Sequence, residues 1–185
     1  MSRSDIGHPV RLHGASGTHK TVSPRQEVLK KLKAVYRFLG GGLREIRAIW
    51  FNEDGSAEVK QFWVDNEESF ARLCTKLSGD ANQVYVGISP RIAPGRGDKK
   101  NVAALTAIVI DIDTLRPEKR LQGATEEELK RVLPVVNRIL SWFDEMGFKR
   151  PLIVMSGNGF QLWCAIPPME ITDENRDEVE TKVKA

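Results

Sequence analysis

Apolar and polar residues follow two different periods along this chain, and these periods divide it into predicted helices and strands. Apolar residues spaced three and four positions apart, typical of amphipathic helices, occur over residues 24–39, 66–77, 126–146 and 172–183. Short β-branched or alternating runs predict strands over residues 43–51, 57–64, 83–88, 104–112, 151–155 and 160–166. Hairpins mixed with helical connections favour an α+β or mixed α/β fold over a regular doubly wound sheet.

Local signals set several of the predicted boundaries. Ser23 suits the N-cap of the first helix and Pro24 its first helical position. The three glycines at 40–42 are expected to end that helix. The Asn-Glu-Asp-Gly sequence at 52–55 predicts a hairpin turn between the first two strands.

The second half of the chain is expected to form around one buried strand. Residues 104–112 are almost continuously apolar, which predicts a central strand covered on both faces. Pro134 is expected to kink the long helix over 126–146 or to divide it in two. Pro167 and Pro168 are expected to end the last strand.

Composition limits the kind of protein this is. The chain has 185 residues, 41% of them hydrophobic, which is enough for one domain with a real core. No run approaches the roughly 20 apolar residues that span a bilayer, and the first twenty residues contain no apolar signal segment. Cys74 and Cys164 match no disulfide or zinc pattern, which favours a reducing, cytoplasmic setting. Residues 1–22 are polar and aperiodic and are expected to form a flexible arm before a single core over 23–185.

Charge is distributed unevenly along the chain. The formal net charge is only +3, but residues 1–44 hold nine Lys and Arg against two Asp and Glu. Residues 169–185 hold six acidic residues against three basic ones. Solubility alone explains both ends, and a phosphate-rich partner is favoured only where further basic residues converge on a site.

Asp111 and Asp113 form the first candidate site, at the end of the predicted central strand. Because side chains alternate along a strand, the two carboxylates are expected to share a face, about 7 Å apart. Mg²⁺ or Mn²⁺ is the natural occupant, since these hard cations bind carboxylate oxygens and leave room for substrate phosphates. The alternative is that Asp113 only begins a turn and Asp111 caps a neighbouring helix.

The second candidate is the turn Ser156-Gly157-Asn158-Gly159 with Gln161 just beyond it. Glycines let backbone N–H groups approach a phosphate closely, and the Ser156 hydroxyl adds a donor. Strand alternation puts Gln161 opposite in facing to Phe160, and on the face that the aspartates use if the strands pair. The alternative is an ordinary hairpin turn, for which Asn-Gly is a common sequence.

The third candidate is the polar loop over residues 89–101, which precedes the acidic strand. Arg91, Lys99 and Lys100 make it a possible clamp for a triphosphate or a nucleic-acid backbone. It lacks the Gly-Lys-Ser/Thr of a Walker loop. The alternative is a solvated surface loop.

These three features together resemble a known family. The segments VYVGISPRIAPGRGDKKNVAALTAIVIDID and PLIVMSGNGFQLWCAIP resemble the catalytic core of archaeo-eukaryotic primases, particularly primase-polymerases of plasmids, viruses and mobile elements. The resemblance covers about residues 83–168. It implies an RRM-like mixed sheet with an N-terminal helix–hairpin subdomain. It also implies that Asp111 and Asp113 bind catalytic metals, while Ser156, Gly157 and Gly159 contact the phosphates of the nucleotide.

Two departures from the family pattern bear on activity. The family's phosphate motif continues to a histidine, and Gln161 stands at that position, where it can donate a hydrogen bond but carries no charge. The family also has a third carboxylate on a later strand, and no residue after Gln161 is an obvious match. We expect the chain to be part of a longer protein, which often continues into a helicase or another domain.

The function expected from this resemblance is metal-dependent nucleotidyl transfer. Such an enzyme would synthesise or extend primers on a single-stranded or primed DNA template, using nucleoside triphosphates with Mg²⁺ or Mn²⁺. The main alternative is a non-catalytic nucleic-acid-binding module on an RRM-like sheet. A metal-dependent nuclease, which also needs clustered acids, is the third.

Overall fold

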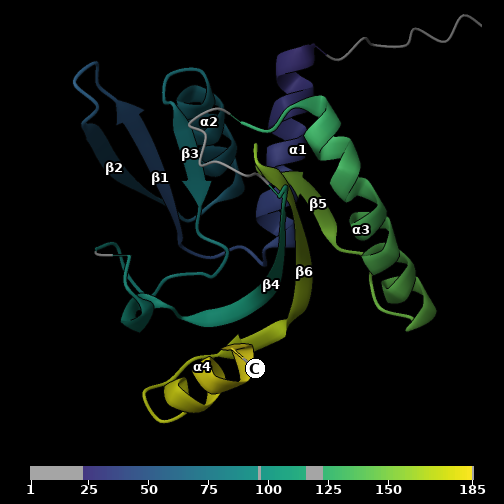
Figure 1. Cartoon of the computed structure of the whole chain (residues 1–185). Coiled ribbons are helices and arrows are strands. Elements are labelled where there is room, and N and C mark those ends of the chain that lie inside the picture. Colours follow the sequence, from purple (N-terminus) through teal and green to yellow (C-terminus); the bar gives the residue numbers. More distant parts are fainter. Residues whose placement is uncertain (1–22, 96, 116–122, 185) are drawn as a thin grey trace, which may run out of the picture.

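The protein has a mixed α+β fold, seen in a computed structural model that describes residues 23–95, 97–115 and 123–184. Within these residues, four α-helices and two three-stranded antiparallel sheets follow one another along the chain (Figure 1). The elements are α1 (Pro24–Phe38), β1 (Arg44–Phe51), β2 (Ala57–Val64), α2 (Glu67–Ser78), β3 (Gln83–Val86), a 3₁₀ turn (Lys99–Asn101), β4 (Ala104–Asp113), α3 (Glu126–Glu145), β5 (Leu152–Met155), β6 (Gly159–Glu170) and α4 (Arg176–Lys184).

Helix α1 begins and ends where the sequence predicts. The Ser23 hydroxyl accepts a hydrogen bond from the Gln26 N–H, and the Gln26 side chain accepts one from the Ser23 N–H. This reciprocal capping box satisfies N–H groups that the first turn would otherwise leave unpaired. Glycines 40–42 all have positive φ, a conformation that other residues rarely adopt, so the helix cannot continue.

The first sheet has the order β2-β1-β3, with β1 in the middle. The hairpin between β1 and β2 is regular, pairing Arg44 with Val64 and Phe51 with Ala57. Helices α1 and α2 cover one face, where Ile46 and Ala48 are buried among side chains of both helices. The opposite face of this sheet is left largely open.

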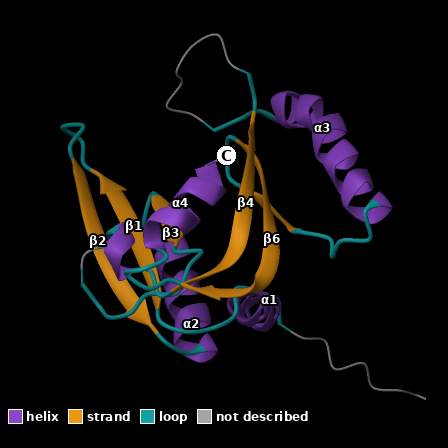
Figure 2. Cartoon of the chain, turned by 90° about the horizontal axis from the view of Figure 1, so that it is seen from below, coloured by secondary structure: helices purple, strands orange, loops and turns teal. Residues whose placement is uncertain are grey.

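The second sheet has the order β4-β6-β5, with β6 in the middle. On one face, Ala107 of β4 and Trp163 of β6 pack with Leu39, which directly follows α1. Helix α3 contacts β4 and β6 and lies along the other side of the sheet (Figure 2). The second sheet is therefore held between α1 and α3.

A buried arginine joins the first sheet to the segment that leads to the second. Arg44 has no exposed surface, and its guanidinium donates to the carbonyls of Leu39, Gly41 and Ile88. Burial lowers the pKa of Arg44 to about 10, since a charged group loses hydration there. Ile88 also packs against the core of the second sheet, so Arg44 ties the end of α1 to both sheets.

Three predictions about the strands are corrected by the structure. Strand β4 is an edge strand and not a central one, because β6 lies between it and β5. Both sheets are antiparallel throughout the described residues, so the expected mixed sheet is wrong. Strand β6 also continues through Pro167 and Pro168 to Glu170. Thr106 of β4 stands opposite three residues of β6 there, and this bulge accommodates prolines that have no N–H to pair.

Of the two outcomes expected at Pro134, a kink or a division of the helix, the structure excludes the division, and α4 differs from the prediction in where it begins. Helix α3 runs through Pro134 without dividing, and because Pro134 is exposed, water is available to the carbonyl that loses its partner. Helix α4 begins at Arg176 and not at Thr172. The Asn175 side chain accepts a hydrogen bond from the Thr172 N–H and donates one to the Glu170 carbonyl, and these two bonds shape a turn ahead of the helix.

Two further expectations concern membrane insertion and the two cysteines. No helix among the described residues is long and apolar enough to cross a membrane. Cys74 and Cys164 are both free thiols, and burial raises the pKa of Cys74 to about 12. The predicted arm over residues 1–22 lies outside the described residues.

Candidate metal and nucleotide site

Asp111 and Asp113 lie at the C-terminal end of β4, both exposed. Their backbone register is regular: Asp111 pairs with Gln161 and Asp113 with Gly159. Residues two apart on a regular strand share a face, which here is the face on which Ala107 packs toward α1. The two carboxylates therefore extend beyond the apolar cluster at the open end of that face.

The turn at 156–159 is a tight hairpin connection between β5 and β6. The Ser156 N–H donates to the Gly159 carbonyl over 3.1 Å, and Gly157 has a φ of 91°. A glycine with positive φ at the first central position is typical of a type II′ hairpin turn. The Thr114 N–H donates to the Asn158 carbonyl, so this turn is held directly beside the end of β4.

Gly159 is required by the approach of two backbones. A Cβ at this position would lie 2.0 Å from the Ile112 carbonyl oxygen and 2.9 Å from the Cα of Asp113. Gly157 in turn accepts a hydrogen bond from the Ala124 N–H, over 2.7 Å, just before α3. The two motif glycines thus have a structural role, as the hairpin interpretation predicts, and they also bring the turn against the aspartates.

Gln161 is half-buried on the same face as Asp111. Its Oε1 accepts a hydrogen bond from the Trp163 indole Nε1 over 3.1 Å, which fixes the orientation of the amide. The amide nitrogen makes no hydrogen bond with another described residue and is free to donate. Gln161 can therefore offer a neutral N–H donor next to the carboxylate of Asp111.

A groove of about 740 Å³ runs between the end of β4 and α3. Asp111 and Asp113 line it together with Glu128 and Arg131 of α3. Residues from both faces of β4 line this groove, at the free edge of the sheet. Sequence reasoning missed Glu128 and Arg131; their three-residue spacing on an amphipathic helix was the available signal.

The donor set suits a hard divalent cation only in part. Neither the Asp111 nor the Asp113 side chain forms an ion pair or hydrogen bond with another described residue, so the carboxylate oxygens are available. Within the described ranges, however, no group of three or more His, Cys, Asp and Glu side chains could hold a metal. Two carboxylates fit one Mg²⁺ or Mn²⁺ that takes its other ligands from substrate phosphates and water.

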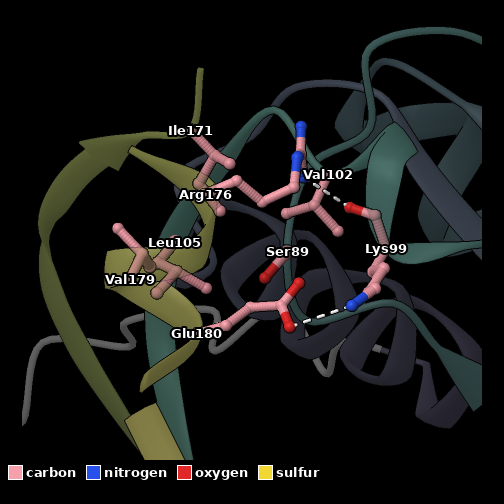
Figure 3. A pocket seen from close by; sticks show the side chains of 8 residues that line it. All are labelled: Ser89, Lys99, Val102, Leu105, Ile171, Arg176, Val179 and Glu180. Carbon is pink, nitrogen blue, oxygen red and sulfur yellow. Dashed lines mark hydrogen bonds and ion pairs between the residues drawn. The ribbon is translucent and has the colours of Figure 1, made fainter. Parts of the chain in front are cut away.

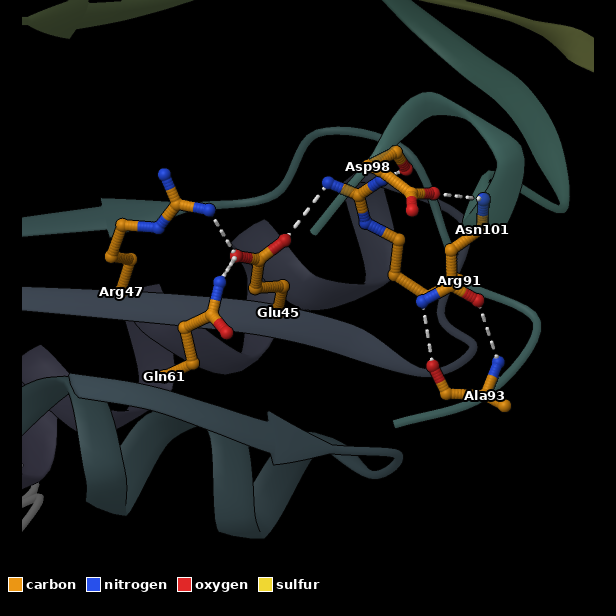
Figure 4. A network of polar contacts seen from close by, with 7 residues as sticks. All are labelled: Glu45, Arg47, Gln61, Arg91, Ala93, Asp98 and Asn101. Atoms are coloured by element: carbon orange, nitrogen blue, oxygen red, sulfur yellow. Dashed lines mark hydrogen bonds and ion pairs between the residues drawn. The ribbon is translucent and has the colours of Figure 1, made fainter. Parts of the chain in front are cut away.

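Arg91 does not line the groove beside the aspartates. Its guanidinium pairs with Glu45 of β1 over 2.9 Å and donates to the Asp98 carbonyl (Figure 4). Glu45 is 4% exposed and also accepts from Arg47 and Gln61. The sequence placed Arg91 near the acids because it precedes β4, but the structure places it against the first sheet.

Lys99 and Lys100 lie in the 3₁₀ turn beside α4. Lys99 pairs with Glu180 over 3.0 Å, and Arg176 donates to the backbone carbonyls of both lysines. Lys99, Arg176 and Glu180 line a separate cavity of about 340 Å³ with several apolar side chains (Figure 3). The structure thus brings together Asp111, Asp113, Gln161 and the turn, and leaves the basic loop residues at other surfaces.

Comparison with known proteins gives no family assignment: no family model, no curated protein and no solved structure matches the chain.

Proposed function

We propose that this chain is the catalytic core of a metal-dependent nucleotidyltransferase of the archaeo-eukaryotic primase type. The observation that carries the proposal is the pairing of β4 with β6. It puts Asp111 opposite Gln161 and Asp113 opposite Gly159, so that two motifs 45 residues apart in sequence meet at one end of a sheet. The substrates would be nucleoside triphosphates and a single-stranded or primed DNA template.

Each group in this site has a distinct role in the proposal. Asp111 and Asp113 would hold Mg²⁺ or Mn²⁺, and the Gln161 amide and the Ser156 hydroxyl would donate to the triphosphate. The bound metal would lower the pKa of the primer 3′-hydroxyl and neutralise the pyrophosphate leaving group. The hydrogen bond from Trp163 holds Gln161 in one orientation before the nucleotide arrives.

A second candidate is a nucleic-acid-binding module without catalytic activity. The observation that favours it is that no group of three or more acidic, His or Cys side chains among the described residues could hold a metal ion. The lack of charge on Gln161 also favours a module without catalytic activity. The third candidate, a metal-dependent nuclease, would use the same two aspartates without a triphosphate.

Nucleotide binding with and without metal separates these candidates. We expect a fluorescent nucleoside triphosphate to bind only when Mg²⁺ or Mn²⁺ is present, and Asp111→Asn to weaken that binding at least about tenfold, since hydrogen bonds and metal contacts to charged groups are worth over 1 kcal/mol. Asp173→Asn is the matched control, because the Asp173 side chain is 99% exposed and lies beside α4.

Three outcomes would count against the proposal. Equal loss in the Asp111 and Asp173 variants would remove the special role of Asp111. Strand binding with no nucleotide binding, with or without metal, would favour the passive module. Metal-dependent degradation of labelled DNA without a triphosphate would favour the nuclease.

A further inference from the structure

The open face of the first sheet carries an arginine–aromatic cluster that the metal site does not use. Strand residues 45, 47, 49 and 51 of β1 point away from α1 and α2, since Ile46 and Ala48 point toward those helices. On this open face Arg47 is paired directly with Tyr85 of β3 and with Gln61 of β2. Arg47, Tyr85 and Arg91 line a cavity of about 410 Å³ with Glu45, Ile49, Val86, Gly87 and Gly97.

Glu45 holds in place the two arginines that give this cavity its positive charge. Its carboxylate is buried and accepts from Arg47 over 2.7 Å, Gln61 over 2.9 Å and Arg91 over 2.9 Å (Figure 4). The anion therefore lies beneath the surface, while the Arg47 side chain is 41% exposed. Two guanidinium groups against one carboxylate leave a net positive charge. The Nε–H of each guanidinium is buried and has no partner among the described residues.

Aromatic and aliphatic side chains continue the same face beyond the arginines. Tyr85 and Phe51 are each 52% exposed and Val59 is 51% exposed. Ile49 pairs with Val59 and Phe51 with Ala57, so a shallow apolar strip follows the strands away from Arg47. A run of large exposed apolar side chains along one sheet face, bordered by charged residues, is typical of a binding surface.

We propose that this open face binds a single strand of nucleic acid. Bases stack on Tyr85 and Phe51, and phosphates contact Arg47, with Arg91 behind it. Exposed aromatic side chains on a sheet beside positive charge are the usual means of holding unpaired bases without strong sequence preference. A duplex hides the base faces that the aromatic rings would contact. Only the identification of the strand as a template depends on the proposed function.

The test uses a short fluorescein-labelled single-stranded oligonucleotide in EDTA, without nucleotide, so that the metal site plays no part. We expect Tyr85→Ala to weaken binding about tenfold, as loss of one base–aromatic stack does. Tyr85→Phe should retain the affinity because the ring remains. Phe148→Ala removes a similarly exposed aromatic after α3 and serves as the control. Thermal unfolding of each variant checks that the fold is kept.

Salt dependence tests the phosphate contact separately. Arg47→Gln should reduce the slope of log affinity against log salt by about one, since one counterion fewer is released. Equal affinities for the Tyr85 and Phe148 alanine variants would overturn the proposal. So would a dimer in solution that Tyr85→Ala converts to a monomer, because the face would then bind a second copy of this chain. Strand binding is measured in EDTA and without nucleotide, so failure of the metal site and failure of this surface give different results.

Discussion

At position 161 a glutamine stands where the resembled primase motif has histidine. The amide can donate one hydrogen bond to a phosphate, whereas an imidazolium would add a positive charge. Gln161→His should therefore strengthen triphosphate binding, and more strongly at low pH, because the imidazole is protonated below its ordinary pKa of about 6.5.

We expect the ratio of variant to wild-type affinity to rise about tenfold between pH 8 and pH 6, the difference between a neutral and a charge-assisted hydrogen bond. Measuring triphosphate affinity at both pH values for both proteins removes the titration of the nucleotide itself. A ratio that does not change with pH would mean that residue 161 does not contact the phosphates.

The positions of the acidic site residues were easier to predict from the sequence than those of the basic residues. That Asp111 and Asp113 share one face of the strand follows from strand alternation alone, which the sequence makes evident. The position of the Arg91 side chain is set by its ion pair with Glu45, 46 residues earlier in the chain. The burial of Glu45 follows from the packing of the first sheet. Proximity in sequence to β4 was therefore a poor guide to where the basic loop lies.

At the scale of elements, the connection between β5 and β6 decides whether the two motifs meet. Gly159→Ala would push a Cβ against the backbone of Ile112 and Asp113. The contacted atoms belong to the backbone, so no side chain can move aside to relieve the clash. We expect a loss of about 2–4 kcal/mol in unfolding free energy, the range for severe overpacking. Nucleotide binding should weaken as well, because the turn shifts away from the aspartates.

Gly55→Ala is the matched control for this prediction. Gly55 also lies in a hairpin connection and, unlike Gly159, has a positive φ, but no atom lies within 4 Å of its added Cβ. That variant should lose only about 1 kcal/mol from backbone strain and keep nucleotide binding. Urea unfolding compares the two; equal losses would show that close approach at Gly159 is not the cause.

Most elements and the β1–β2 hairpin could be predicted from the sequence, but not the order of the strands in each sheet. Caps such as Ser23 and the helical spacing of α1 are local properties and were predicted correctly. Which strand lies in the middle of a sheet depends on tertiary contacts, so β4 was wrongly expected to be central. The passage of β6 through Pro167 depends on a bulge opposite Thr106, which only the partner strand reveals.

For the whole molecule, Arg44 is the link that we expect stability to depend on most. Arg44→Met removes a buried guanidinium and leaves the carbonyls of Leu39, Gly41 and Ile88 without that donor. The unfolding free energy should fall by about 3–5 kcal/mol, the range for breaking a buried charged network. Arg72→Met, at an exposed ion pair on α2, should cost less than about 1 kcal/mol. Similar urea midpoints for the two variants would contradict this role.

We propose that Asp111 and Asp113 bind a metal ion beside Gln161 and the turn at 156–159, and Mn²⁺ binding followed by NMR tests this placement. Paramagnetic Mn²⁺ broadens the amide NMR signals of nearby residues, whichever element they belong to. We predict selective broadening at Asp111, Asp113, Gly159 and Gln161, little change along β2 at the far edge of the first sheet, and loss of the effect in Asp111→Asn. Broadening centred on the acidic first turn of α3 or on α4, or broadening that persists in Asp111→Asn, would contradict the account.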